Sequence, residues 1–194
     1  MALESSEVRS FGFGHVYIAD VGSTEPANIS AEVDPDAGWI ELGHISDAGP
    51  RFSFGKGRSA VPSWQSFPDP VRNLKAAAAT TCSFDLLQWN RYTLPLALGG
   101  GTWAESGGMY TFTPADAADV NEKALIVEAT DDVYNYRFIF RRTENQANVD
   151  FAWTGSALAP LPIQSTILTP DGTGTAPYII QSDDPNIGAA EAAS

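Results

Sequence analysis

Apolar and polar side chains alternate at every second position in several short segments, and this alternation constrains the fold more than any other feature. In the segment 133–142, the aromatic residues Tyr134, Tyr136, Phe138 and Phe140 fall at alternate positions. In a β-strand such residues lie on one face, so we expect this stripe to be buried in a core. The same reasoning predicts strands at 15–22, 39–46, 51–57, 109–114, 123–131, 148–155, 163–168 and 178–181. The chain is therefore predicted to be mainly β, as a β-sandwich or half-barrel.

Residues 74–89 are ambiguous, because four alanines favour a helix whereas Cys82 and Phe84 favour a strand. We interpret the segment as one long strand. One of its two faces is small and polar, as expected of a sheet that borders solvent: Lys75, Ala77, Ala79, Thr81, Ser83 and Asp85. Residues 90–103 follow, with Asn90 as a helix N-cap, leucines at helical spacing and three glycines, which together predict one short helix.

The chain is acidic, with 24 acidic and 11 basic side chains and a formal net charge of −13. Binding of nucleic acid by phosphate neutralisation requires the opposite sign. The acidity either serves solubility or repels polyanions from a surface. No apolar run has the length of a signal peptide or a membrane span, so we expect folding in a cytosol and no membrane insertion.

Residues with catalytic or metal-binding potential are few and scattered. His15 and His44 are far apart in the sequence and lack the spacing of a zinc site. Cys82, the single cysteine, cannot form an internal disulfide and is typical of a small buried apolar residue. The acidic pairs 131–132 and 183–184 fall in a turn and in a polar tail, where we expect them to be solvated. The sequence predicts no catalytic site, no metal site and no cofactor.

The segment AVPSWQSFPDPVRN (60–73) contains three prolines, which exclude a helix interior or a central strand. Trp64 and Phe67 lie between these prolines, although large aromatic side chains gain little from contact with water. We therefore expect this segment to reach a second surface.

An ordered set of elements is similar to the major tail tube proteins of long-tailed bacteriophages. The set comprises an opening strand with a turn, a Trp-x-x-Leu-Gly-x-Ile-Ser motif, a long loop, a Phe-x-Leu-x-Gln-x-Asn element and a leucine-rich helix that ends at glycine. The matching residues are Gly22, Ser23, Thr24 and Pro26; Trp39, Leu42, Gly43, Ile45, Ser46, Asp47 and Gly49; Phe84, Leu86, Gln88 and Asn90; and Leu96, Leu98 and Gly99. The likeness extends over most of residues 13–181, including 153–173, and leaves 102–132 without a matching feature.

The resemblance implies a tube subunit with a β-sandwich or half-barrel, one short flanking helix and a long loop between the second and third strands. We divide the chain into an N-terminal arm (1–14), a tube domain (15–181) with an inter-subunit loop at 57–74, and an acidic tail (182–194). Such subunits close into hexameric rings, which stack into the tail tube of a siphovirus-type, non-contractile virion. Assembly in the host cytoplasm is implied, as are other copies of the chain, a tape measure protein in the lumen, and tail terminator and distal tail proteins at the ends. Genomic DNA passes through without specific binding.

Two groups of candidate site residues follow. Contact with neighbouring subunits or rings is assigned to the long loop, with residues Pro62, Trp64, Phe67, Pro68 and Arg72. A negative lumen wall repels DNA and prevents sticking during ejection. The candidates for that wall are Glu41, Ala77, Ala79, Thr81, Ser83, Asp85 and Glu128.

Other functions remain open at this point. A carbohydrate-binding or adhesin-type sandwich, such as a virion decoration domain, would be a monomer with an exposed aromatic platform. An injection-tube protein of a contractile tail or a secretion system would share the ring architecture. An enzyme is disfavoured by the missing chemistry.

Overall fold

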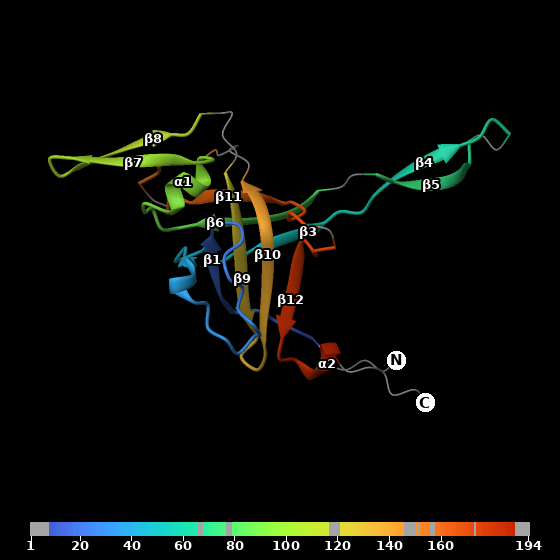
Figure 1. The fold of residues 1–194 in the computed structure, drawn as a ribbon, viewed down its shortest axis with the longest axis horizontal. Coiled ribbons are helices and arrows are strands. Elements are labelled where there is room, and N and C mark those ends of the chain that lie inside the picture. Colours follow the sequence, from blue (N-terminus) through green and yellow to red (C-terminus); the bar gives the residue numbers. More distant parts are fainter. Residues whose placement is uncertain are drawn as a thin grey trace.

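The computed structural model describes residues 8–65, 68–76, 79–116, 121–145, 150, 152–155, 158–172 and 174–188. Figure 1 shows a β-rich body from which two hairpins, β4–β5 and β7–β8, project on opposite sides. In chain order the elements are β1 (Phe13–Ala19), the 3-10 turn η2 (Pro35–Ala37), β2 (Ile40–Glu41), β3 (Arg51–Phe54), β4 (Gly57–Pro62), β5 (Pro70–Ala76), β6 (Thr80–Leu86), α1 (Thr93–Ala97), β7 (Gly101–Ser106), β8 (Met109–Pro114), β9 (Glu122–Thr130), β10 (Asn135–Asn145), β11 (Leu161–Ile167), β12 (Tyr178–Ser182) and α2 (Pro185–Gly188). The prediction of a mainly β chain is confirmed.

The strands of the body form one antiparallel sheet in the order β2-β1-β9-β10-β11-β6-β3, and β12 also pairs with β10. The long strand β10 pairs first with β12 and then, from Thr143, with β11. Its register with β9 shifts between Phe140 and Thr143. This irregularity bends the sheet, so that side chains of β1, β9 and β10 pack against those of β6 and β11 in one core.

Phe138 and Phe140 of the β10 aromatic stripe lie in this core, and Tyr136 is buried outside it, with its ring against Phe11. Tyr136 is 5% exposed and Phe140 is fully buried. Half-buried Phe138 stacks on Phe52 of β3, with the ring centroids 4.9 Å apart. Tyr134 precedes β10 and is half-buried. Stacking between rings of facing strands adds to the apolar burial that holds the two halves together.

The opposite face of β1, β9 and β10 is covered by the connection between β1 and β2. Trp39 is 3% exposed and packs in a second apolar cluster with Ile126 and Ile139. Its indole N–H donates a hydrogen bond to the carbonyl of Thr24 at 2.8 Å. This part of the sheet is therefore buried on both faces.

The strand expected at 39–46 is much shorter, because β2 contains only two residues. Gly43 has a φ of 83°, a left-handed conformation that ends the strand. Beyond it, Ile45 forms an isolated antiparallel bridge with Leu86. The segment crosses from β1 to the end of β6 and does not continue as one strand.

The interpretation of 74–89 as one strand is wrong. β5 ends at Ala76, β6 begins at Thr80, and the two strands belong to different sheets. Lys75 therefore lies in the projecting hairpin and not on β6. Within β6 the alternation is confirmed by the buried residues Cys82, Phe84 and Leu86.

The predicted short helix is confirmed as α1. The side-chain oxygen of Asn90 accepts hydrogen bonds from the backbone N–H groups of Tyr92 and Thr93, at 2.8 and 3.0 Å. These bonds satisfy donors that the first helical turn leaves free. The glycines at 99–101 all have positive φ values, which ends the helix after five residues.

The strand expected at 148–155 is not found in its described part. Residues 152–155 have no strand structure, and Trp153 is 77% exposed. Val149 and Phe151, its expected neighbours on one face, lie outside the described residues.

Candidate functional site

Residues 56–65 and 68–76 form a projecting arm (Figure 1), and we call the segment 56–76 the basic arm. Its strands β4 and β5 pair antiparallel from Gly57 and Ala76 to Pro62 and Pro70. The two prolines stand at the last pair of the ladder, where a missing N–H donor removes few hydrogen bonds. Residues that we expected to form an irregular loop therefore form a paired hairpin, which holds its tip away from the body.

The tip of the basic arm exposes a large aromatic side chain. Trp64 is 94% exposed, the highest value among the exposed large apolar residues of the described chain. Pro62, Pro68 and Arg72 are exposed close to it in the hairpin. Phe67 lies outside the described residues. The described contact candidates thus lie at or near one tip.

Charge is distributed unevenly between the basic arm and the rest of the chain. The arm carries four basic residues, Lys56, Arg58, Arg72 and Lys75, against the single acidic residue Asp69, which gives a formal charge of +3. Because the whole chain carries −13, the remaining residues carry −16. The arm is a positive extension of a strongly negative subunit.

Most basic residues of the body have acidic partners. The ion pairs are Arg9 with Asp131 and Asp184, Lys123 with Asp20, Arg137 with Glu128, Arg141 with Glu25, and Arg142 with Glu122 and Asp171. Among the described residues, Arg58 and Arg72 have no acidic group within 4.0 Å. The charges of Arg58 and Arg72 are therefore not neutralised by the described part of their own subunit.

The side of β3, β6 and β11 that points away from the core carries mostly polar side chains, and we call it the polar face. Thr81, Ser83 and Asp85 are half-buried on the side of β6 opposite its core residues. Their cross-strand neighbours are mostly polar as well: Arg51, Ser53, Pro162, Gln164 and Thr166. Ala79 is exposed just before β6, and Ala77 lies outside the described residues. The three lumen candidates on β6 are thus brought together on a surface without large apolar side chains.

The other two lumen candidates lie elsewhere, on the far face of β1, β2 and β9. The carboxylate of Glu41 is 2.7 Å from Nδ1 of His15. Glu128 faces Arg137 directly across β9 and β10, and accepts a hydrogen bond from its Nε at 2.6 Å. Neither carboxylate shares a surface with Asp85.

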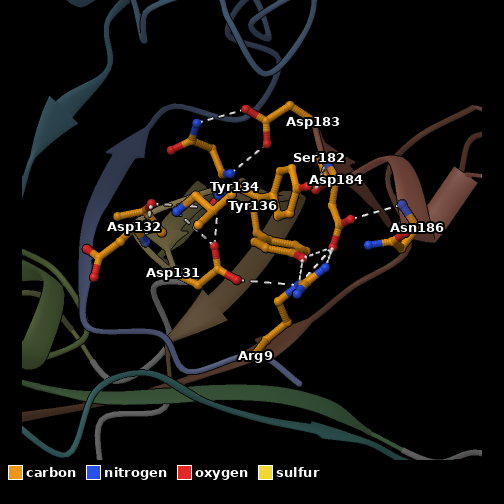
Figure 2. Close-up of polar contacts among 12 residues, drawn as sticks. Arg9, Asp131, Asp132, Tyr134, Tyr136, Ser182, Asp183, Asp184 and Asn186 are labelled. Carbon is orange, nitrogen blue, oxygen red and sulfur yellow. Dashed lines mark hydrogen bonds and ion pairs between the residues drawn. The ribbon is translucent and has the colours of Figure 1, made fainter. Parts of the chain in front are cut away.

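A cluster of charged and phenolic groups joins the two ends of the chain (Figure 2). The Nε of Arg9 donates to Asp184 and to the hydroxyl of Tyr136, both at 2.8 Å, and lies 3.4 Å from Asp131. Tyr136 also donates to Asp184, which is 5% exposed. The expectation that the acidic pairs 131–132 and 183–184 are solvated is therefore wrong for Asp184, and also for Asp131, whose side chain is 8% exposed. Sequence reasoning had no signal for a contact between groups 175 positions apart.

The environment of Asp184 shifts its pKa. Burial raises the pKa of this carboxyl. Hydrogen bonds from Tyr136, the Asn186 N–H and Arg9 lower the pKa, and their combined effect is larger than that of burial. The net pKa lies below the ordinary value of 3.8, so Asp184 is ionised at neutral pH. The charge neutralises Arg9 and fixes residues 8–12 beside the C-terminal segment.

A groove lies where α1 meets the hairpin β7–β8, and we call it the aromatic groove. Its volume is about 420 Å³, and its lining includes Trp89, Leu94, Trp103, Glu105 and Tyr110. Sequence reasoning assigned no role to β7 and β8, whose alternation was visible only in β8. The groove forms because the β7–β8 hairpin and the residues around the start of α1, all within 89–110, bring their aromatic rings to one place.

The described residues contain no group of three or more His, Cys, Asp and Glu side chains that could hold a metal ion. Within the same part of the chain, no helix is long and apolar enough to cross a membrane. Cys82 is fully buried, and burial raises the pKa of its thiol to about 12, which makes it a poor nucleophile.

A comparison with protein families gives one match over almost the whole chain. The family model described as "Phage tail tube protein" matches residues 1–191. The chain belongs to the phage tail tube protein family. This tail tube protein is thus a structural component of the virion tail, and the resemblance to phage tail tube proteins is confirmed. None of the curated proteins compared with it matches.

The family match covers all the surfaces described above. The matched range includes the basic arm, the polar face and the aromatic groove, and also residues 102–132, for which the sequence offered no family feature. A tube is built from many copies of one subunit. Exposed apolar side chains and unpaired charges on the subunit are therefore first candidates for contacts between copies.

Proposed function

We propose that copies of the tail tube protein close into hexameric rings, and that these rings stack into the tube of a non-contractile tail. The observation that carries this proposal is the basic arm, a positively charged hairpin with an exposed Trp64 on a negatively charged subunit. Large exposed aromatic side chains and unpaired arginines are typical anchors of protein interfaces. The ring number of six rests on the resemblance alone.

The sheet edges provide a route to ring closure. Among the described strands, β3 pairs only with β6, and β12 pairs only with β10, so each has one unpaired edge. Exposed edges favour pairing with another chain. In the proposed ring, the edge of one subunit is completed by a strand of its neighbour, and a closed ring leaves no edge free.

In the proposed tube the polar face lines the lumen. The face has no large apolar side chain, and Asp85 balances the charge of Arg51, which lies opposite Ser83, so it offers DNA no net positive charge. In a subunit with a net charge of −13, a wall without net positive charge gives phosphates nothing to bind, so genomic DNA passes from the capsid to the host. Asp85 remains a lumen carboxylate in this proposal. Glu41 and Glu128 do not, because they lie on another face, where Glu41 contacts His15 and Glu128 contacts Arg137.

The remaining partners follow from the same assembly. A tape measure protein would occupy the lumen while the tube grows in the host cytoplasm, and terminator and distal tail proteins would close its ends. The basic arm would dock on an adjacent subunit or on the next ring, with Trp64 as its anchor. Prolines on both sides of the tip restrict its conformations and reduce the entropy lost on docking.

The test is tube formation by the purified protein, followed by negative-stain electron microscopy. The unaltered chain should form tubes of uniform diameter with a ring repeat along the axis. Trp64→Ala should give a folded subunit, judged by circular dichroism, that forms no tubes or only short ones. Val133→Ala serves as the control, because Val133 is also exposed but lies in the turn between β9 and β10. Normal tubes from Trp64→Ala contradict the role of the arm.

A second candidate function is favoured by the aromatic groove. Grooves lined by Trp and Tyr suit the apolar faces of sugar rings, as in a carbohydrate-binding decoration domain on the virion. That function predicts a lasting monomer with measurable binding of oligosaccharides. Size-exclusion chromatography and glycan binding of the same preparation separate the two candidates.

A further inference from the structure

The aromatic groove has a surface suited to receive a large apolar side chain. Trp89 and Trp103 are each about one-third exposed, at 36% and 37%, and Tyr110 is 69% exposed. Leu94 adds an aliphatic side chain from α1. A water-exposed groove of this composition is stabilised when an apolar partner displaces the water.

Hydrogen bonds fix the two indoles that line the groove. The N–H of Trp89 donates to the carbonyl of Ala159 at 2.9 Å, and the N–H of Trp103 donates to the carbonyl of Arg91 at 3.2 Å. The polar edge of each ring is thus satisfied within the subunit, whereas part of each ring remains exposed. A receiving surface that is already ordered loses little entropy when a partner docks.

The basic arm of the same copy is not the occupant of this groove. Figure 1 shows β4–β5 and β7–β8 projecting from opposite sides of the body. An arm on one side and a groove on the other give a head-to-tail contact between copies. Repetition of such a contact yields a closed ring or a continuing stack.

The charges of the two surfaces are complementary. The groove carries Glu105 on β7, and the chain outside the arm has a net charge of −16. The arm has a net charge of +3, and Arg58 and Arg72 have no acidic partner in the described part of the subunit. Arg91, the basic residue of the groove, is held over the ring of Tyr92 at 4.6 Å. A basic occupant therefore fits the groove better than an acidic one.

We propose that the aromatic groove receives the tip of the basic arm of a second copy, with Trp64 packed between Trp103, Tyr110 and Leu94. Arg72 or Arg58 then approaches Glu105, and Pro62 and Pro68 cover the rim. This inference rests on the proposed tube assembly and names the surface to which its arm attaches.

Cysteine cross-linking tests the contact directly. Gln65 neighbours Trp64 at the tip, and Ala104 lines the groove; both are exposed. Tubes grown from a mixture of Gln65→Cys and Ala104→Cys subunits should give disulfide-linked dimers on oxidation. Native Cys82 does not interfere, because it is fully buried. A mixture of Gln65→Cys and Asp36→Cys, with the second cysteine on the exposed η2 turn, should give no dimers.

Matched substitutions on the β7–β8 hairpin measure the contribution of the groove. Tyr110→Ala should raise the protein concentration needed for tube growth at least about tenfold, as for a central interface aromatic. Met109→Ala should change it less than about twofold, because Met109 is equally exposed but does not line the groove. Both residues are exposed in the subunit, so neither change should prevent folding.

The outcomes separate this inference from the proposed function. If tubes form but the Gln65 and Ala104 cysteines never join, or if Tyr110→Ala behaves like Met109→Ala, the groove is not the receiving surface while tube assembly stands. If the unaltered chain forms no tubes, both are overturned.

Discussion

The guanidinium of Arg9 and the carboxylate of Asp184 form a hydrogen-bonded ion pair at one end of the sheet, together with the hydroxyl of Tyr136 (Figure 2). The side chain of Asp184 is 1% exposed, and that of Arg9 is 15% exposed. The pair fixes the segment before β1 to the segment after β12. The described segments before β1 and after β12 therefore lie side by side.

The lowered pKa of Asp184 predicts an acid-sensitive contribution to stability. A carboxyl whose pKa is lower in the folded state stabilises the fold above its unfolded pKa, here about 3.8, and this contribution is lost as the pH falls through the folded pKa. Asp184→Asn should therefore lower the melting temperature at pH 7 and reduce the further loss below pH 3.8. Thermal unfolding followed at several pH values measures both.

The control for this experiment is Asp36→Asn, which removes the same charge from an exposed turn. It should leave the melting temperature and its pH dependence unchanged. Equal pH profiles for Asp184→Asn and the unaltered protein would show that the ion pair does not stabilise the fold.

The buried guanidinium of Arg137 predicts a larger effect on stability. This residue is 3% exposed, and it donates to Glu128 and to the backbone carbonyls of Asn28 and Ala31. Arg137→Leu leaves Glu128 and both carbonyls without these donors, so it should lower the free energy of unfolding by about 3–5 kcal/mol. Hydrogen exchange should also become faster in residues 24–31, which the guanidinium holds against the sheet. Denaturant unfolding that differs from the unaltered protein by less than about 1 kcal/mol speaks against this role.

Gly14 illustrates a close approach that the sequence does not reveal. A Cβ atom added at this position would lie 2.2 Å from the backbone carbonyl oxygen of Glu128 on β9. Gly14→Ala should therefore displace β1 from β9 and lower the free energy of unfolding by about 1–3 kcal/mol. Gly12→Ala is the matched control, because nothing lies within 4 Å of the added atom. The prediction fails if both alanine variants unfold at the same denaturant concentration.

The strands were predictable wherever one face is buried and the other polar. β6 meets this condition, and its buried residues fall where the alternation places them. In β10 the alternation found the aromatic face, but Arg137 and Ile139 on the other face are buried as well. The break between β5 and β6 was not predictable, because consecutive alanines give no contrast between faces. The hairpin β4–β5 was also missed, since its residues are exposed on both sides and its prolines suggested an irregular loop.

The candidate sites show the same limit. Trp64 was found from sequence because an aromatic residue among prolines is unusual, and its exposure depends on no distant residue. By contrast, the aromatic groove depends on how the β7–β8 hairpin lies against α1, and the Arg9 cluster joins residues 175 positions apart. Contacts of this kind depend on the topology of the sheet, which the pattern of a single strand does not contain. The sequence does not distinguish Glu128 from Asp85 as a candidate for the lumen wall. In the structure Glu128 lies on another face of the sheet, paired with Arg137.

The proposed lumen surface leads to a prediction on DNA binding. Asp85→Lys changes a carboxylate on the polar face into an ammonium group in every subunit of a ring. Tubes of this variant should retain short duplex DNA at low salt, and the binding should weaken steeply as salt rises, because the released counterions increase with the number of phosphates contacted. Tubes of the unaltered protein should not bind, since Asp85 offsets the charge of Arg51 and leaves the face without net positive charge. Sedimentation of tubes with fluorescent DNA measures the difference.

Asp36→Lys provides the matched control, because it makes the same change of charge on the exposed η2 turn at the far face of the body. If the polar face lines the lumen, DNA held by Asp85→Lys tubes should be protected from nuclease along the length of the tube. DNA bound to Asp36→Lys tubes, if any binds, should be digested, because it lies outside the wall. Equal digestion in the two cases places Asp85 on the outer surface and removes the polar face from the proposed lumen.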